Sequence, residues 1–111
     1  MKVKSKVWFE ENGVHVFGEG KAKLLKAIGK TGSINRAAEE MGMSFRRAWS
    51  YITTAEKRLG FPLIDRFRGG RNGGHSSLTR RAKVLIEYYD RLSKTVRNYT
   101  DKKSGKTKGT R

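Results

Sequence analysis

The residues of this sequence best suited to chemistry are the arginines of its central part. Between positions 44 and 81, nine basic residues stand against two acidic ones, and the whole chain has a formal charge of +16. Arg46 and Arg47 follow a serine that can cap a helix, and guanidinium groups near the start of a helix suit guanine edges or phosphates. A charge excess of one sign indicates a polyanionic partner, and double-stranded DNA is the partner we expect.

A glycine-rich run, GGRNGG, lies within the same basic segment. Arg66, Arg68 and Arg71 stand in it or beside it. Glycines let the backbone approach phosphates or enter a minor groove, where an arginine prefers a narrow, negative groove. This pattern is typical of a wing, which we expect over residues 66–78. The residues expected at the DNA are Ser44, Phe45, Arg46, Arg47, Ser50, Tyr51, Arg68, Gly69, Gly70, Arg71, Asn72, Gly73 and Gly74.

Residue types that support catalysis or metal binding are scarce. The chain has no cysteine, which excludes disulfides and thiolate zinc sites, and its two histidines are far apart at His15 and His75. Gly29-Lys30-Thr31 has the ending of a phosphate-binding loop, but Leu24 stands where that loop requires a glycine. We therefore expect no enzyme, no metal site and no cofactor.

Nothing in the sequence predicts a membrane protein. No apolar run approaches the roughly 20 residues that span a bilayer. The first ten residues contain lysines without the apolar stretch of a signal peptide. We expect a cytoplasmic protein that does not contact a membrane.

Two helices and a tight turn are expected to position the central arginines. The periodicity predicts helices over residues 34–41 and 45–59, the second capped by Ser44 and serving as a recognition helix over 44–59. Ala38 is small enough for a close helix crossing, and Gly42 can supply the positive φ of the turn. This spacing predicts a helix-turn-helix. The expected buried face of the second helix, with Trp49 in the core, is Phe45, Ala48, Trp49, Ile52, Ala55 and Leu59.

The flanking segments complete a winged helix-turn-helix. Asn12-Gly13 between alternating runs predicts a hairpin over residues 3–18, because both turn positions need a positive φ. The other expected elements are a helix over residues 20–30, strands over 63–67 and 77–78, and a last helix that Thr79 caps and that runs to residue 100. The predicted fold class is mainly α with small β, in one domain over residues 1–100.

The last helix carries an apolar seam that predicts a homodimer. The seam repeats at heptad spacing through Leu78, Ala82, Leu85, Tyr89, Leu92, Val96 and Tyr99. Packing on its own domain is the alternative, and part of the helix must do this.

The chain ends in a basic segment. Residues 101–111 hold no apolar side chain, so we expect a disordered basic tail.

Four motifs are specific in combination: GSI-x2-AA, GMS-x2-RAW, LG-x-PL, and GG-x2-GG before LT. With them, about residues 7–95 resemble the N-terminal DNA-binding domain of the molybdate-responsive ModE regulators, and more distantly the LysR-type regulators. The resemblance implies a winged helix, a dimer through the first and last helices, and transcriptional control. ModE regulators carry molybdate-binding domains after this one, whereas a lysine-rich tail follows here, so we expect no molybdate response. His75 departs from the more uniformly glycine wing of that family and is expected to alter groove contacts.

The leading interpretation is a sequence-specific DNA-binding transcription regulator. One alternative is a non-specific architectural or nucleoid DNA-binding protein, for which the charge and the tail would suffice. Another is a winged-helix protein-interaction module. A regulator prefers its site over random DNA by roughly 10³ or more, and a docking module lacks a steep salt dependence on DNA.

Overall fold

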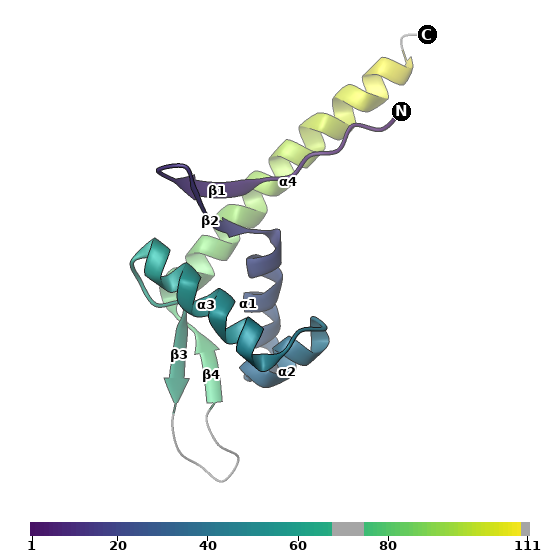
Figure 1. Ribbon diagram of the computed structural model, residues 1–111. Coiled ribbons are helices and arrows are strands. Elements are labelled where there is room, and N and C mark those ends of the chain that lie inside the picture. Colours follow the sequence, from purple (N-terminus) through teal and green to yellow (C-terminus); the bar gives the residue numbers. More distant parts are fainter. Residues whose placement is uncertain (68–74, 110–111) are drawn as a thin grey trace.

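The computed structural model describes residues 1–67 and 75–109, which form a winged helix-turn-helix with an N-terminal hairpin and a long C-terminal helix (Figure 1). This architecture confirms the predicted fold class. The elements in chain order are β1 (Trp8–Glu11), β2 (Val14–Gly18), α1 (Glu19–Thr31), α2 (Ile34–Glu40), α3 (Phe45–Leu59), β3 (Ile64–Phe67), β4 (His75–Leu78) and α4 (Arg80–Gly109).

The N-terminal hairpin turns at Asn12 and Gly13, whose φ values of 52° and 79° both lie in the left-handed region as the sequence predicts. Its first strand is shorter than expected and begins at Trp8. The reason is its partner: β2 ends at Gly18, where α1 begins, so residues before Trp8 have no strand to pair with. Those residues run beside α4 instead (Figure 1), where Tyr89 Oη donates a hydrogen bond of 2.7 Å to the carbonyl of Val7.

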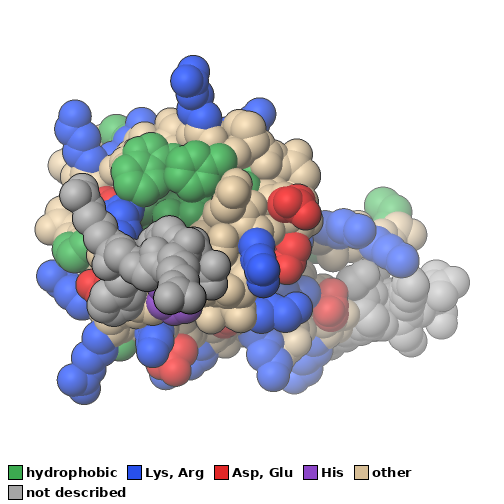
Figure 2. All heavy atoms as spheres, turned by 90° about the horizontal axis from the view of Figure 1, so that it is seen from below, with side chains coloured by type: hydrophobic (Ala, Val, Ile, Leu, Met, Phe, Trp, Pro, Cys, Tyr) green, Lys and Arg blue, Asp and Glu red, His purple; other side chains and the backbone are tan. Residues whose placement is uncertain are grey.

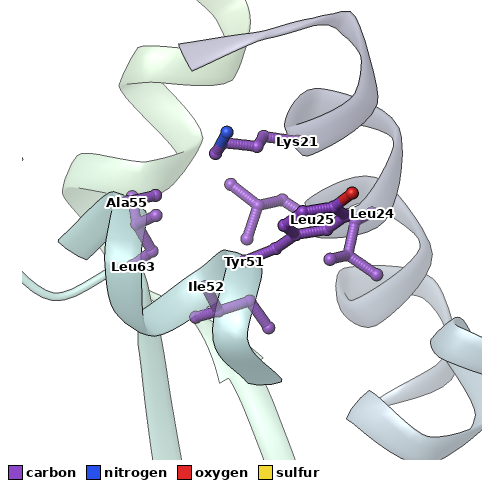
Figure 3. Close-up of a pocket in the computed structure, with 7 residues that line it drawn as sticks. All are labelled: Lys21, Leu24, Leu25, Tyr51, Ile52, Ala55 and Leu63. Carbon is purple, nitrogen blue, oxygen red and sulfur yellow. The ribbon is translucent and has the colours of Figure 1, made fainter. Parts of the chain in front are cut away.

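The core lies where α1, α2 and α3 cross. Leucine and isoleucine side chains from α1 and α3 interdigitate with Leu63 at the start of the wing (Figure 3). Small residues, among them Ala38 and Ala48, are fully buried at the crossings and let the helices approach closely. The largest fully buried side chains are Phe17, Leu24, Leu25, Ile28 and Leu63.

The first half of α4 packs on the hairpin and on α1. The Tyr89 ring meets the rings of Phe9 and Phe17 edge to face at 5.5 Å each, and burial raises the pKa of its hydroxyl. Lys26 of α1 forms a 2.8 Å ion pair with Asp90. Two members of the expected dimer seam, Ala82 and Tyr89, are therefore buried within the chain itself. The hairpin and α1 cover this side of the helix, as the sequence analysis expected for part of α4.

The end of α4 also differs from the prediction. The helix does not stop at Thr100 but continues to Gly109. Lysine has a good intrinsic helix propensity, and extending an existing helix adds one backbone hydrogen bond for each residue fixed. The lack of apolar residues therefore does not end the helix. Residues 110–111 lie outside the described part of the chain.

Candidate nucleic-acid interface

Serine caps and a glycine turn, both recognisable in the sequence, define the helix-turn-helix. The side chains of Ser33 and Ser44 cap α2 and α3, each accepting a backbone hydrogen bond of 3.1 Å from the residue three positions on. Between the helices, Gly42 has a φ of 69°, and the N–H of Met43 donates to the carbonyl of Ala38 at 2.9 Å. The turn therefore fixes the direction in which α3 leaves the core.

The exposed side of α3 holds two aromatic rings that the sequence analysis placed in the core. Phe45 is 48% exposed and Trp49 is 39% exposed. Their rings stack with centroids 6.1 Å apart and planes inclined by 23°. The inward side is occupied by Ala48, Ile52 and Ala55, and the close crossing that these alanines permit leaves no room for an indole. The core assignment of Phe45 and Trp49 was therefore wrong.

Figure 2 looks at the molecule from below and shows a hydrophobic patch on this side, with Lys and Arg side chains at its edges. Arg46 and Ser50 are exposed on α3 as well. Within the described residues, the guanidinium of Arg46 has no hydrogen bond, ion pair or ring contact. Its side chain can therefore reach outward to a ligand without breaking an internal contact.

Arg47 and Tyr51 lie on the flank of α3 that faces α1. The Arg47 guanidinium donates to Tyr51 Oη from Nε at 3.1 Å and from Nη2 at 2.9 Å. Tyr51 is half-buried, and the ammonium of Lys21 lies 5.6 Å from its ring centroid (Figure 3). Burial lowers the pKa of Lys21, and the nearby Arg58 lowers it further. Tyr51 is thus turned away from the outward side that Arg46 and Ser50 share.

The wing strands β3 and β4 pair antiparallel from Ile64 opposite Leu78 to Phe67 opposite His75. The expected contact residues at positions 68–74, which include Arg68, Arg71 and Asn72, lie outside the described residues. At the base of the wing, the Ser76 N–H donates to the carbonyl of Gly32 at 3.0 Å. A side chain at Gly32 would collide with His75, so His75 packs against the end of α1.

Glu56 joins the wing to α3, and the sequence analysis did not single it out. Its Oε2 accepts hydrogen bonds from the N–H groups of Leu63 at 2.7 Å and Ile64 at 3.3 Å. Its Oε1 pairs with Arg66 at 3.3 Å. The Arg66 guanidinium in turn lies 4.4 Å from the ring centroid of Trp49. A signal existed in the sequence, since Glu56 and Asp65 are the two acidic residues between positions 44 and 81.

Within the described part of the chain, no three histidine or acidic side chains gather as metal ligands would. None of the described helices is both long and apolar enough to cross a membrane.

A family model described as bacterial regulatory helix-turn-helix protein, lysR family, matches residues 21–83. The chain belongs to this family. As a LysR-family helix-turn-helix chain, it is a DNA-binding domain of a transcriptional regulator and not an enzyme.

Curated relatives confirm the resemblance to ModE. The chain is 40% identical over 75 residues to the transcriptional regulator ModE of Haemophilus influenzae, covering 68% of this chain and 29% of that protein. It is 36% identical over 90 residues to the molybdenum-pterin-binding protein MopB of Rhodobacter capsulatus, covering 81% of this chain and 33% of that protein. This LysR-family chain therefore spans a third or less of the length of these relatives.

Two solved structures share the fold. The chain aligns with the CbnR DNA-binding domain from a complex with DNA at a TM-score of 0.60 and 18% identity, covering 79% of this chain and 95% of that one. It aligns with the BenM DNA-binding domain from a complex with benA site 1 DNA at a TM-score of 0.55 and 21% identity, covering 82% and 92%. At these identities the likeness concerns the fold alone.

Proposed function

We propose that this chain recognises a specific duplex sequence and thereby regulates transcription, with α3 in the major groove and the wing on the adjacent groove or backbone. The main support comes from the two sides of α3. Arg46, Trp49 and Ser50 are exposed on its outward side, and the opposite side packs in the core. A helix fixed in this way presents the side chains of its N-terminal half to DNA in a fixed orientation. The +16 charge supplies the attraction to phosphates.

The exposed residues divide between two roles. Arg46 and Ser50 reach base edges, since they lie on the outward side. Arg47 contacts a phosphate at the flank, because its hydrogen bonds to Tyr51 hold it to the side of the helix. Residues Arg68, Gly69, Gly70, Arg71, Asn72, Gly73 and Gly74 follow the backbone or enter the next groove.

We also propose a homodimer through the outer side of α4. Val84 is 57% exposed, and Tyr88 is 50% exposed although one part of its ring contacts Phe9 of the hairpin, with ring centroids 5.6 Å apart. Together with Phe61 and Leu85 they line an open hollow of about 370 Å³. The α4 helix of a second copy would cover these apolar side chains, and a two-fold pair would present two recognition helices to paired half-sites. Because the family acts on the chromosome of bacteria, we infer a cytoplasmic location.

The deciding experiment is a selection of bound duplexes from a randomised library, followed by salt titrations of the selected and random duplexes. We expect an affinity ratio of roughly 10³ or more, with a steep negative slope of log affinity against log salt on both. A ratio near one would favour an architectural DNA-binding protein. Weak binding to both duplexes without a salt slope would favour a protein-interaction module.

A further inference from the structure

Packing in the core does not explain the position of the aromatic pair, Phe45 and Trp49. Both rings are large, both are more than a third exposed, and they lie one turn apart on the outward side of α3. Apolar residues scattered singly on a surface need no explanation, but a contiguous pair at the centre of a charged surface does. Figure 2 shows a hydrophobic patch with basic side chains at its edges on the face of the molecule that it draws.

Two neighbouring side chains hold the Trp49 ring in place. Phe45 stacks on it at 6.1 Å, and the Arg66 guanidinium lies 4.4 Å from its centroid. Arg66 is itself fixed by its ion pair with Glu56, which is tied to the wing backbone. The rings are therefore presented in a defined geometry before any ligand arrives, which lowers the entropy cost of using them in recognition.

The surroundings identify the class of ligand. The neighbours of the pair are Arg46, Arg66 and Ser50, so the patch suits a surface that is apolar at one point and anionic around it. The floor of the major groove offers hydrogen-bond donors and acceptors at every base pair and one apolar group, the C5-methyl of thymine. Phosphates line both sides of that groove. This combination is the complement of the patch.

We infer that the aromatic pair reads thymine, with Phe45 and Trp49 packing against C5-methyl groups in the major groove. The inference rests on the proposed function, because it requires α3 to enter that groove. It adds Trp49 to the interface and assigns a base preference to the apolar part of α3, next to the hydrogen-bonding part at Arg46.

The test removes the methyl groups one at a time. In the library-selected duplex, each thymine is replaced singly by deoxyuridine, which keeps base pairing and loses only the methyl. Burial of one such group corresponds to about a four-fold change in affinity. We expect that loss for the wild-type chain at one or more thymines, and no loss at the same positions for Phe45→Ala or Trp49→Ala. Trp8→Ala is the matched control, since Trp8 is 45% exposed on β1, on the other side of α3 from the wing (Figure 1).

A second measurement needs no variant and so does not depend on how Trp49→Ala folds. The thymines that respond are replaced by 5-iodouracil, and the wild-type complex is irradiated. We expect the crosslinked peptide to contain Phe45 or Trp49. If every deoxyuridine replacement is silent in the wild type, or if the crosslink maps elsewhere, the thymine inference is overturned while DNA recognition by α3 stands. If no duplex is selected at all, both this inference and the proposed function fail.

Discussion

Arg46 and Arg47 are neighbours in the sequence but have different surroundings in α3. Arg46 extends outward without an internal contact among the described residues, whereas Arg47 is held by two hydrogen bonds to Tyr51. The difference predicts different functions for the two guanidinium groups. One is available for a base edge, and the other has the fixed side position of a phosphate contact.

We expect Arg46→Ala to weaken binding to the selected duplex by about 1–3 kcal/mol and to relax the base preference at one position, because a bidentate contact is lost. Arg47→Ala should weaken selected and random duplexes about equally. Lys57→Ala, in the last turn of α3, is the basic control. Fluorescence anisotropy with both duplexes measures this, and unchanged affinity in both arginine variants would refute the recognition-helix assignment.

Glu56 has a structural function that can be tested without DNA. Glu56→Ala removes the acceptor of the Leu63 and Ile64 N–H groups. Leaving partly buried donors unsatisfied should lower the free energy of unfolding by about 1–3 kcal/mol. Chemical denaturation of this variant and of Glu40→Ala, an exposed acidic control on α2, gives the comparison. Equal midpoints for the two variants would mean that the carboxylate does not tie the wing to α3.

At the scale of elements, the sequence was most informative where the signal is local. Asn12-Gly13, Gly42 and the serine caps each depend on a few neighbouring residues, and each was confirmed. Trp49 was misplaced because helical periodicity locates the buried face of α3 only to within about one residue. Trp49 is next to Ala48 in the sequence, and the assumption that a large ring is buried then placed it in the core. How closely α3 approaches α1 decides that question, and it is a property of the packed molecule.

The outer side of α4 predicts the assembly state. Val84→Glu with Tyr88→Glu places two charges on the proposed dimer surface, where burial without a partner is costly. Light scattering should give a monomer, with reduced affinity for a paired site. Both positions are at least half exposed, so the fold should persist even though Tyr88→Glu removes the ring contact with Phe9. Leu85, by contrast, is half-buried and contributes to the core.

Lys94→Glu is the control for this experiment, because Lys94 lines a different groove, the one between α4 and α1. A wild-type chain that is already monomeric at micromolar concentration would remove the basis for the dimer. A double variant that remains dimeric would move the interface to another surface.

At the scale of the whole molecule, α4 makes the chain elongated. The radius of gyration is 17.0 Å and the extents are 64 × 30 × 23 Å, whereas a compact chain of this length would have a radius of about 13 Å. The distal part of α4 includes the basic residues Lys102, Lys103, Lys106 and Lys108, and the sequence continues to Arg111. Lys102 and Lys103 are exposed, so they can add charge without contributing to the core.

Deleting residues 101–111 should therefore weaken binding to all duplexes about equally and leave the thermal midpoint unchanged. Each phosphate contact contributes about −0.9 to the slope of log affinity against log salt, so the slope should flatten by a few units at most. Salt titrations of the full and shortened chains on selected and random duplexes measure the change. A loss confined to the selected duplex would show that this segment reads sequence.

The exposed position of Trp49 has an optical consequence. The chain has two tryptophans, one on the proposed DNA surface and one at Trp8 in the N-terminal hairpin. Trp8→Phe would leave a single indole emitter on α3, in contact with water and with the Arg66 guanidinium. Docking against a nucleobase would exclude that water and change the emission intensity. Trp49 thus serves as an intrinsic fluorescent probe. Stopped-flow mixing of this variant with unlabelled duplex would measure the rate at which α3 enters the groove.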